Sequence, residues 1–328
     1  MNEAWLQEIR ALYSDAEKRI ADQLSFGNLS AASAKRKTVI LARIQAELKS
    51  LGTTTSKGFA SVLPSEYSAG ANGAQSLAGF GKRLTTANFA GIDTAAVETA
   101  LASALGDTDF ALSQVFRRCK ELVQSKSLDF AKNAGISRIV AASEASGASV
   151  AELSRELAGY INPAWFDKYV AAQKGEFFKL SGRTWRVSDY AHLTAQTHMG
   201  TTQNMGSMNW SLKHGFRFSQ MSKHPGACKT CALYQGKVYS LTGRAEKDHT
   251  GKMRQPISVV PGAGGLVHPY CGHNFSPWGI PDEVQALEFG DAKTAAAAVR
   301  HPDPVEPTAG KAGGFAPSQA AKVSKAGK

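Results

Sequence analysis

The segment His224–Ser240, HPGACKTCALYQGKVYS, holds two cysteines three positions apart, and HPYCGHNFSPW at His268–Trp278 adds a third cysteine between two histidines. Zinc takes four ligands in a tetrahedron, and the turn within a CxxC pair lets both thiolates point at one centre. We therefore expect the two segments to fold back and meet around a zinc ion held by the three cysteines and one histidine. The candidate metal ligands are Cys228, Cys231, His268, Cys271 and His273.

Two other interpretations of these cysteines stay open. The cysteines can be small buried residues of a core, with the histidines hydrogen-bonded at the surface. They can also carry redox or nucleophilic chemistry, for which Cys271, His273 and Asn274 supply a thiolate, its base and an orienting amide. We do not expect such a centre, because neighbouring residues of a strand point apart and because a strand, GKVYSL, follows the CxxC pair too closely for a redox helix.

A metal-dependent nuclease of the HNH type, or another DNA-processing enzyme, is the alternative function. The residue types of its motif occur in the right order, although this class pairs its first CxxC with a second one that is missing here. An activated water needs a complete metal cage, and we expect the Asp-His pair to lie in a solvated loop, AEKDHTGKMRQP. The residues concerned are Cys228, Cys231, Asp248, His249, Gly264, Gly265 and Asn274.

Length, charge and cysteine use define the class of protein. The 328 residues suffice for two domains, and an apolar fraction of 43% is typical of a globular chain. A formal net charge of +11 favours polyanionic partners such as nucleic acid. No run reaches about 18 apolar residues, the N-terminus is acidic where a signal peptide is basic, and the four cysteines form no disulfide framework, so we expect cytoplasmic synthesis and no membrane contact.

The chain is predicted to be α+β. Residues 1–52 are expected to form a helical hairpin, 53–91 a Gly/Ser/Ala-rich connector that is a loop or loosely helical, and 92–175 a helical region. A small mixed domain with short antiparallel strands follows at 176–281, and 282–328 is expected to be a flexible basic tail, since it has too few large apolar residues to offset the entropy of ordering.

Apolar periodicity predicts the individual elements. Helices are expected at 2–26, 32–51, 93–105, 109–123, 127–134, 149–160, 163–174 and 189–212, with Gly52 ending the second. Strands are expected at Gly182–Val187 and within FRFSQM and GKVYSL. We expect Trp185, Trp210 and Trp278 to anchor the mixed domain. The polar side chains of the long helix are expected to form a solvated face: Gln196, Thr197, His198, Gln203 and Asn204.

The order of features from Tyr190 onward resembles the C-terminal domain of tailed-phage minor head proteins, the group of phage minor capsid protein 2 and the Mu F-like head morphogenesis proteins. In that group a long helix leads into a strand, then a cysteine pair, then GKV with an aromatic residue, and finally HPxCRH or HPxCRC. The matching positions here are Cys228, Cys231, Gln235–Ser240, His268, Pro269 and Cys271. Gly272 stands where the group has arginine, and Gln196, Thr197 and His198 stand where it has RTE.

This resemblance implies a structural minor head protein and no enzyme. Its expected partners are the portal protein, the major capsid protein or both, together with packaged DNA. It implies no small-molecule substrate. The expected locations are the virion head and, during assembly, the host cytoplasm. Head morphogenesis near the portal or at the capsid interior is the expected function.

Overall fold

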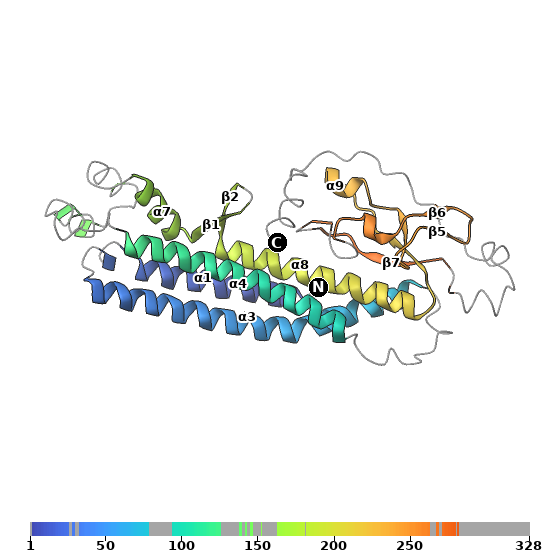
Figure 1. Cartoon of the computed structure of the whole chain (residues 1–328), viewed down its shortest axis with the longest axis horizontal. Helices are drawn as coiled ribbons and strands as arrows, with labels where there is room; N and C mark the ends of the chain where they lie inside the picture. The colour runs from blue at the N-terminus through green and yellow to red at the C-terminus, as the bar shows by residue number, and fades with distance from the viewer. Residues whose placement is uncertain are drawn as a thin grey trace. The chain divides into compact units, whose positions relative to one another are not determined.

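The computed structural model describes residues 2–25, 28–29, 33–78, 94–125, 138–139, 142, 145–146, 152, 163–180, 182–262, 267–268, 271–279 and 281. Its helices are α1 (Glu3–Gln23), α3 (Ala34–Leu77), α4 (Thr94–Gln124), α7 (Pro163–Gln173), α8 (Val187–Lys213), α9 (Lys229–Ala232) and the 3-10 turn η3 (Ile257–Val259). Its strands are β1 (Glu176–Leu180), β2 (Arg183–Arg186), β3 (Phe218–Met221), β4 (Val238–Ser240), β5 (Glu246–Lys247), β6 (Met253–Arg254) and β7 (Phe275–Trp278). The fold is α+β, as predicted (Figure 1).

The helix that we expected to end at Gly52 instead runs on to Leu77, so much of the expected connector is helical. A glycine inside a helix costs about 1 kcal/mol relative to alanine. Here the missing side chain serves packing, because a Cβ on Gly52 would lie 3.1 Å from Cδ1 of Leu112 in α4. Further along α3, Phe59 and Tyr67 are fully buried and give the helix an apolar face. The Gly-rich sequence of this part did not indicate that face.

The two helices expected at 93–105 and 109–123 are one helix, α4. Gly106 and Asp107 resemble a break in sequence, yet Ala104 and Val115 on either side are fully buried and continue a single apolar stripe. The predictions for α1, α7, α8, β2, β3 and β4 are confirmed within a few residues. The helices expected at 127–134 and 149–160, apart from Glu152, and the tail at 282–328 lie outside the described residues.

The chain divides into two compact units. A helical unit comprises Glu3–Gly58 and Leu105–Thr194, and a mixed unit comprises Met1–Asn2, Phe59–Ala104 and Ala195–Lys328. In the helical unit α1 and α3 are antiparallel, as predicted for the N-terminal hairpin. Three contacts show it, because their partners run in opposite directions along the two helices: Arg19 with Glu47 at 2.5 Å, the hydroxyls of Thr55 and Tyr13 at 3.2 Å, and Trp5 against Gly58.

The start of α8 is tied to α1 by one buried carboxylate. Glu17 is 4% exposed, accepts a hydrogen bond from the backbone N–H of Ser188 at 2.6 Å and pairs with Arg186 at 2.9 Å. A carboxylate near the first turn of a helix satisfies a free backbone N–H and complements the helix dipole. The β1–β2 hairpin, which ends at Arg186, is thereby held against α1.

In the mixed unit the second half of α3 crosses α8 at very short range. A Cβ on Gly70 would lie 1.9 Å from the carbonyl oxygen of Gln203, and a Cβ on Gly206 would lie 2.0 Å from that of Tyr67. Only glycine fits at either position, so the two backbones touch there. Asn209 of α8 also donates to the hydroxyl of Tyr67 at 3.0 Å.

A three-stranded antiparallel sheet completes the mixed unit, with strand order β4-β3-β7. The central strand β3 pairs with β4 on one side and with β7 on the other, so both cysteine-bearing segments are attached to the same strand. Trp210 and Trp278 are buried in this unit, as expected, whereas Trp185 is buried in the helical unit and does not anchor the mixed one. None of the helices in the described residues has the length and apolar character needed to cross a bilayer.

Candidate metal centre

The first half of the site is the cysteine pair around α9. Cys228 is the N-cap of this short helix, and its Sγ accepts a hydrogen bond from the backbone N–H of Cys231 at 3.4 Å. Gly226, with φ of 77°, turns the chain just before it, a conformation that favours glycine. Because residues three apart on a helical turn share one face, both sulfurs point the same way. The expected tight turn is thus a capped helical turn.

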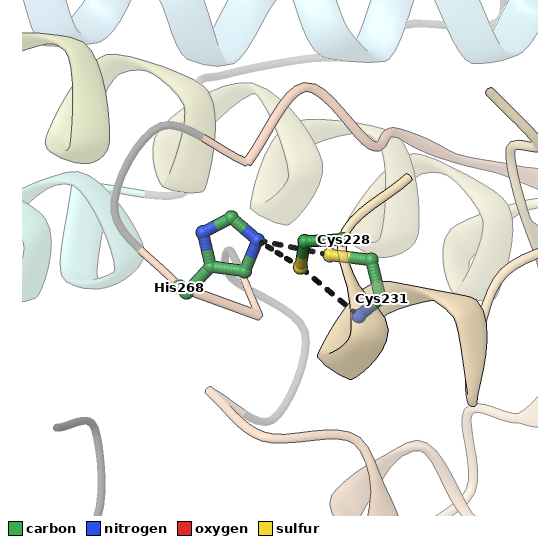
Figure 2. Close-up of side chains that lie close together, drawn as sticks. All are labelled: Cys228, Cys231 and His268. Atoms are coloured by element: carbon green, nitrogen blue, oxygen red, sulfur yellow. Dashed lines mark hydrogen bonds between the residues drawn. The ribbon is translucent and has the colours of Figure 1, made fainter. Parts of the chain in front are cut away.

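The second half of the site meets the first, as predicted. The ring Nε2 of His268 lies 3.1 Å from Sγ of Cys228 and 3.1 Å from Sγ of Cys231, as Figure 2 shows. A turn closed by a hydrogen bond from the N–H of Cys271 to the carbonyl of His268, 3.0 Å long, then carries Cys271 towards the same place. Its Sγ lies 3.8 Å from that of Cys231.

The distance between the sulfurs of Cys231 and Cys271 fits a tetrahedral zinc site. Two thiolates bound to one zinc at about 2.3 Å are separated by about 3.8 Å in a tetrahedron. The five predicted ligands form two overlapping groups, Cys228 with Cys231 and His268, and Cys231 with Cys271 and His273, each with ligand atoms within 4.8 Å of one another. Cys231 belongs to both groups. The donor set contains thiolates and imidazoles and no carboxylate, which is the combination that zinc prefers.

Gln235 determines which nitrogen of His273 faces the sulfurs. Its Oε1 accepts a hydrogen bond from the backbone N–H of His224 at 3.0 Å and lies 3.2 Å from Nε2 of His273. Since an oxygen that accepts from a backbone N–H cannot be the amide nitrogen, Nε2 of His273 must donate to it. In the neutral ring Nδ1 is therefore left with a lone pair, and it lies 3.3 Å from Sγ of Cys271. Metal-binding histidines are oriented in this way.

The centre is enclosed by apolar side chains. Cys231, Cys271 and His273 are 1%, 5% and 5% exposed. The surrounding cluster consists of Met208, Met221, Ala227, Tyr239, Val260, Val267 and Phe275. Thiolates in such a place are costly without a cation, because burial penalises the charged form.

The two buried thiols share their protons unequally. The hydrogen bond with Cys231 lowers the pKa of Cys271 to about 3, although burial acts in the opposite direction. The hydrogen bond with Cys271, together with burial, raises the pKa of Cys231. One sulfur of the pair is therefore a thiolate, the form that binds metals.

Helix α8 forms hydrogen bonds to the backbone of the second half of the site. The residues that make them were not predicted to have this role. Asn204 donates from Nδ2 to the carbonyl of His273 and accepts on Oδ1 from the N–H of Phe275, both at 3.2 Å. Ser207 donates to the carbonyl of Phe275 at 2.6 Å. The polar face of this helix is therefore not solvated, contrary to our expectation, since Asn204 is 1% and His198 7% exposed.

The expected separation of Cys271 and His273 is also wrong. The two side chains are in contact, with Sγ of Cys271 3.3 Å from Nδ1 of His273, and the strand begins only at Phe275. Residues two apart share a face even in a strand, so strand alternation would not have separated them. Asn274 does not join them, as its backbone N–H donates to Ser222 and its side chain is exposed. The amide that orients His273 is that of Gln235 and not that of Asn274.

Asp248 does not lie in a solvated loop, which corrects another prediction. It is 6% exposed and organises the turn between β5 and β6, accepting from the N–H groups of Thr250 and Lys252 at 2.8 and 3.1 Å and from Arg254 at 2.5 Å. His249 stacks on Trp278 with ring centroids 4.7 Å apart. Within the described residues neither belongs to a group that could hold a metal, while Gly264 and Gly265 lie outside them.

A long helix, a small antiparallel sheet and a Cys/His centre that joins two distant segments form a compact mixed domain. Residues 167–295 match the family model of phage minor capsid protein 2. This match confirms the resemblance expected for the C-terminal part, covers less than half of the chain and supports a structural role in a phage head. A search of curated proteins finds no match, and a search of solved structures finds none.

Proposed function

We propose that this protein is a structural minor capsid protein of a tailed phage that acts in head morphogenesis near the portal or at the capsid interior. The observation that supports the proposal is the family match at 167–295, which spans β1, β2, α8 and the strands and cysteines that follow α8. The portal protein, the major capsid protein or both are the proposed partners. The protein would meet them in the host cytoplasm during assembly and remain in the virion.

Mass spectrometry of intact virions and of purified procapsids from the source phage tests this function. We expect the polypeptide in both particles, at a copy number far below that of the major capsid protein. Crosslinking within procapsids should join it to the portal or to the coat. Its detection only in the soluble fraction of infected cells would contradict the proposal.

We further propose that zinc closes the mixed domain and performs no chemistry there. The ligands would be Cys228, Cys231, Cys271 and His273. We choose His273 over His268 because it is the more buried of the two and because Gln235 fixes its ring orientation. The metal would join segments on either side of a long excursion of the chain and so lower the entropy of the unfolded state.

Metal analysis of the purified full chain under reducing conditions tests the zinc site. Zinc is expected in a stoichiometric amount in the wild type and lost in Cys228→Ser, Cys271→Ser and His273→Ala. The matched control is Cys119→Ser, because Cys119 is also a fully buried cysteine but belongs to the helical unit. A zinc-free wild type would contradict the proposal, and loss of zinc in His268→Ala but not in His273→Ala would overturn the choice of histidine.

The proposed role includes no catalysis. Asp248 is fully engaged by its own turn and by Arg254, which removes it from the metal cage that the nuclease alternative needs. We expect no nicking of supercoiled DNA with Mg²⁺, Mn²⁺ or Zn²⁺. Nicking by the wild type that disappears in His249→Ala would instead support the nuclease.

A further inference from the structure

Positive charge is concentrated in residues 190–281, the C-terminal part of the mixed domain. Residues 190–281 contain nine lysines and arginines and two carboxylates, Glu246 and Asp248. Since the whole chain has a formal net charge of +11, most of its excess lies in this part. No acidic residue occurs between 190 and 245, a stretch that includes α8, β3, the cysteine pair and β4.

Both carboxylates are bound to arginines of the same domain. Glu246 pairs with Arg217 at 2.7 Å and with Arg244 at 3.0 Å, and Asp248 pairs with Arg254 at 2.5 Å. Burial alone would raise the pKa of Asp248, but hydrogen bonds from Thr250 and Arg254 lower it. This carboxylate therefore stays charged and paired with Arg254. Both acidic side chains are therefore held by arginines.

Three lysines of this stretch lie in or near the helical turn that carries Cys228 and Cys231. We call them the turn lysines: Lys223, Lys229 and Lys237. All three are exposed, and within the described residues no carboxylate pairs with them. Their backbone positions are fixed by the fold. The carbonyl of Lys237 accepts from Met221 at 3.0 Å, Lys223 follows two residues after Met221, and Lys229 begins α9 next to Cys228.

We propose that the turn lysines form a surface that binds the phosphate backbone of double-stranded DNA. Exposed lysine ammonium groups contact phosphates without recognising the base sequence. A surface without carboxylates does not repel the phosphates. A rigid turn beneath them keeps the charges in place. Even with zinc bound by three thiolates, which leaves one negative charge, the domain stays strongly positive. The inference rests on the proposed function, since in a phage head the genome is the polyanion at hand.

Titration of the full-length protein with a fluorescent DNA duplex of random sequence, at increasing NaCl, tests the surface. The triple variant Lys223→Gln, Lys229→Gln, Lys237→Gln should bind at least tenfold more weakly. The slope of log affinity against log salt should become shallower by about 3, because each lost phosphate contact releases about one counterion fewer. Circular dichroism and zinc content of this variant should equal those of the wild type.

The matched control removes the same charge from the helical unit, with Lys35→Gln, Lys49→Gln and Lys57→Gln on exposed positions of α3. It should bind DNA as the wild type does. Equal losses in both variants would show that net charge alone matters, and an unchanged affinity of the turn variant would place binding elsewhere. Either result overturns the inference.

Incorporation into heads separates this inference from the proposed function. If the turn variant binds DNA normally but is missing from procapsids, the lysines contact an acidic protein partner and the inference is wrong while the structural role stands. If the wild type binds no DNA but is found in heads, only the DNA surface is lost. If the wild type is absent from heads, the proposed function itself fails.

Discussion

Asn204 in the middle of α8 donates a hydrogen bond to the backbone carbonyl of His273 across 3.2 Å and accepts one from the next strand at the N–H of Phe275. The side chain thus pairs with the backbone of the metal-site segment as a neighbouring strand would. Removing it leaves a buried donor and a buried acceptor without partners, each at a cost of about 1 to 3 kcal/mol. Asn204→Ala should lower the free energy of unfolding by about 3 kcal/mol, measured by urea denaturation.

Asn209→Ala is the comparison for this variant. It removes an amide from the same helix whose hydrogen bond to the hydroxyl of Tyr67 is only partly buried. We expect a loss of about 1 kcal/mol and an unchanged zinc affinity. Equal effects of the two variants would show that Asn204 has no special role in holding the site.

The crossing of α3 and α8 predicts opposite effects for two glycines of one helix. Gly70→Ala would place a Cβ 1.9 Å from a backbone oxygen, so the helices must separate, and we expect a loss of about 2 to 3 kcal/mol. Gly73→Ala meets nothing within 4 Å and should stabilise the protein by up to about 1 kcal/mol, since alanine is the better helix former. A higher melting temperature for both variants would disprove the close crossing.

Gln235 orients His273, so its loss should weaken zinc binding without removing a ligand. Groups that orient metal ligands change metal affinity by about 10- to 100-fold when mutated. Gln235→Ala is expected to show this decrease in competition with a fluorescent zinc chelator. Gln220→Ala serves as the control, because that amide donates to the carbonyl of Gly236 and does not contact His273 in the described part of the chain. An unaltered affinity in Gln235→Ala would favour His268 as the ligand.

Asp248 should make the domain less stable in acid. Burial raises its pKa, but the hydrogen bonds from Thr250 and Arg254 outweigh that effect, so the folded pKa lies below the ordinary 3.8. The stabilisation is therefore fully present above pH 3.8 and is lost as the pH falls through the folded value. Thermal unfolding of the wild type and Asp248→Asn should differ most near neutral pH and converge in strong acid. A constant difference at every pH would rule out this source of stability.

The sequence predicts the C-terminal part of the fold well because its signals are local. Strand alternation identifies β3 and β4, and the spacing of Cys228 and Cys231 requires both sulfurs to face one centre. The meeting of Cys231 with Cys271 was predicted from chemistry alone, since buried thiolates and imidazoles need a common cation. No further information was needed for these elements.

The errors occur where packing between distant segments overrides local preference. Gly52 looks like a helix stop, but its small size is used against Leu112, and no local pattern reports that partner. Asn204 looks like a solvated residue for the same reason, because its hydrogen-bond partners are about 70 residues away along the chain. Gln235 was part of a predicted strand segment, and only the folded structure shows that it orients His273.

The central position of β3 has a consequence for cleavage of the chain. The exposed bend at Thr242–Arg244 lies between β4 and β7, and each of these strands hydrogen-bonds to β3 rather than to the other. A protease that cut this bend would sever the peptide bond, yet the downstream fragment would keep its strand on β3 and its contacts to α8. A nicked protein would migrate as two bands under denaturing conditions and as one particle in its native state.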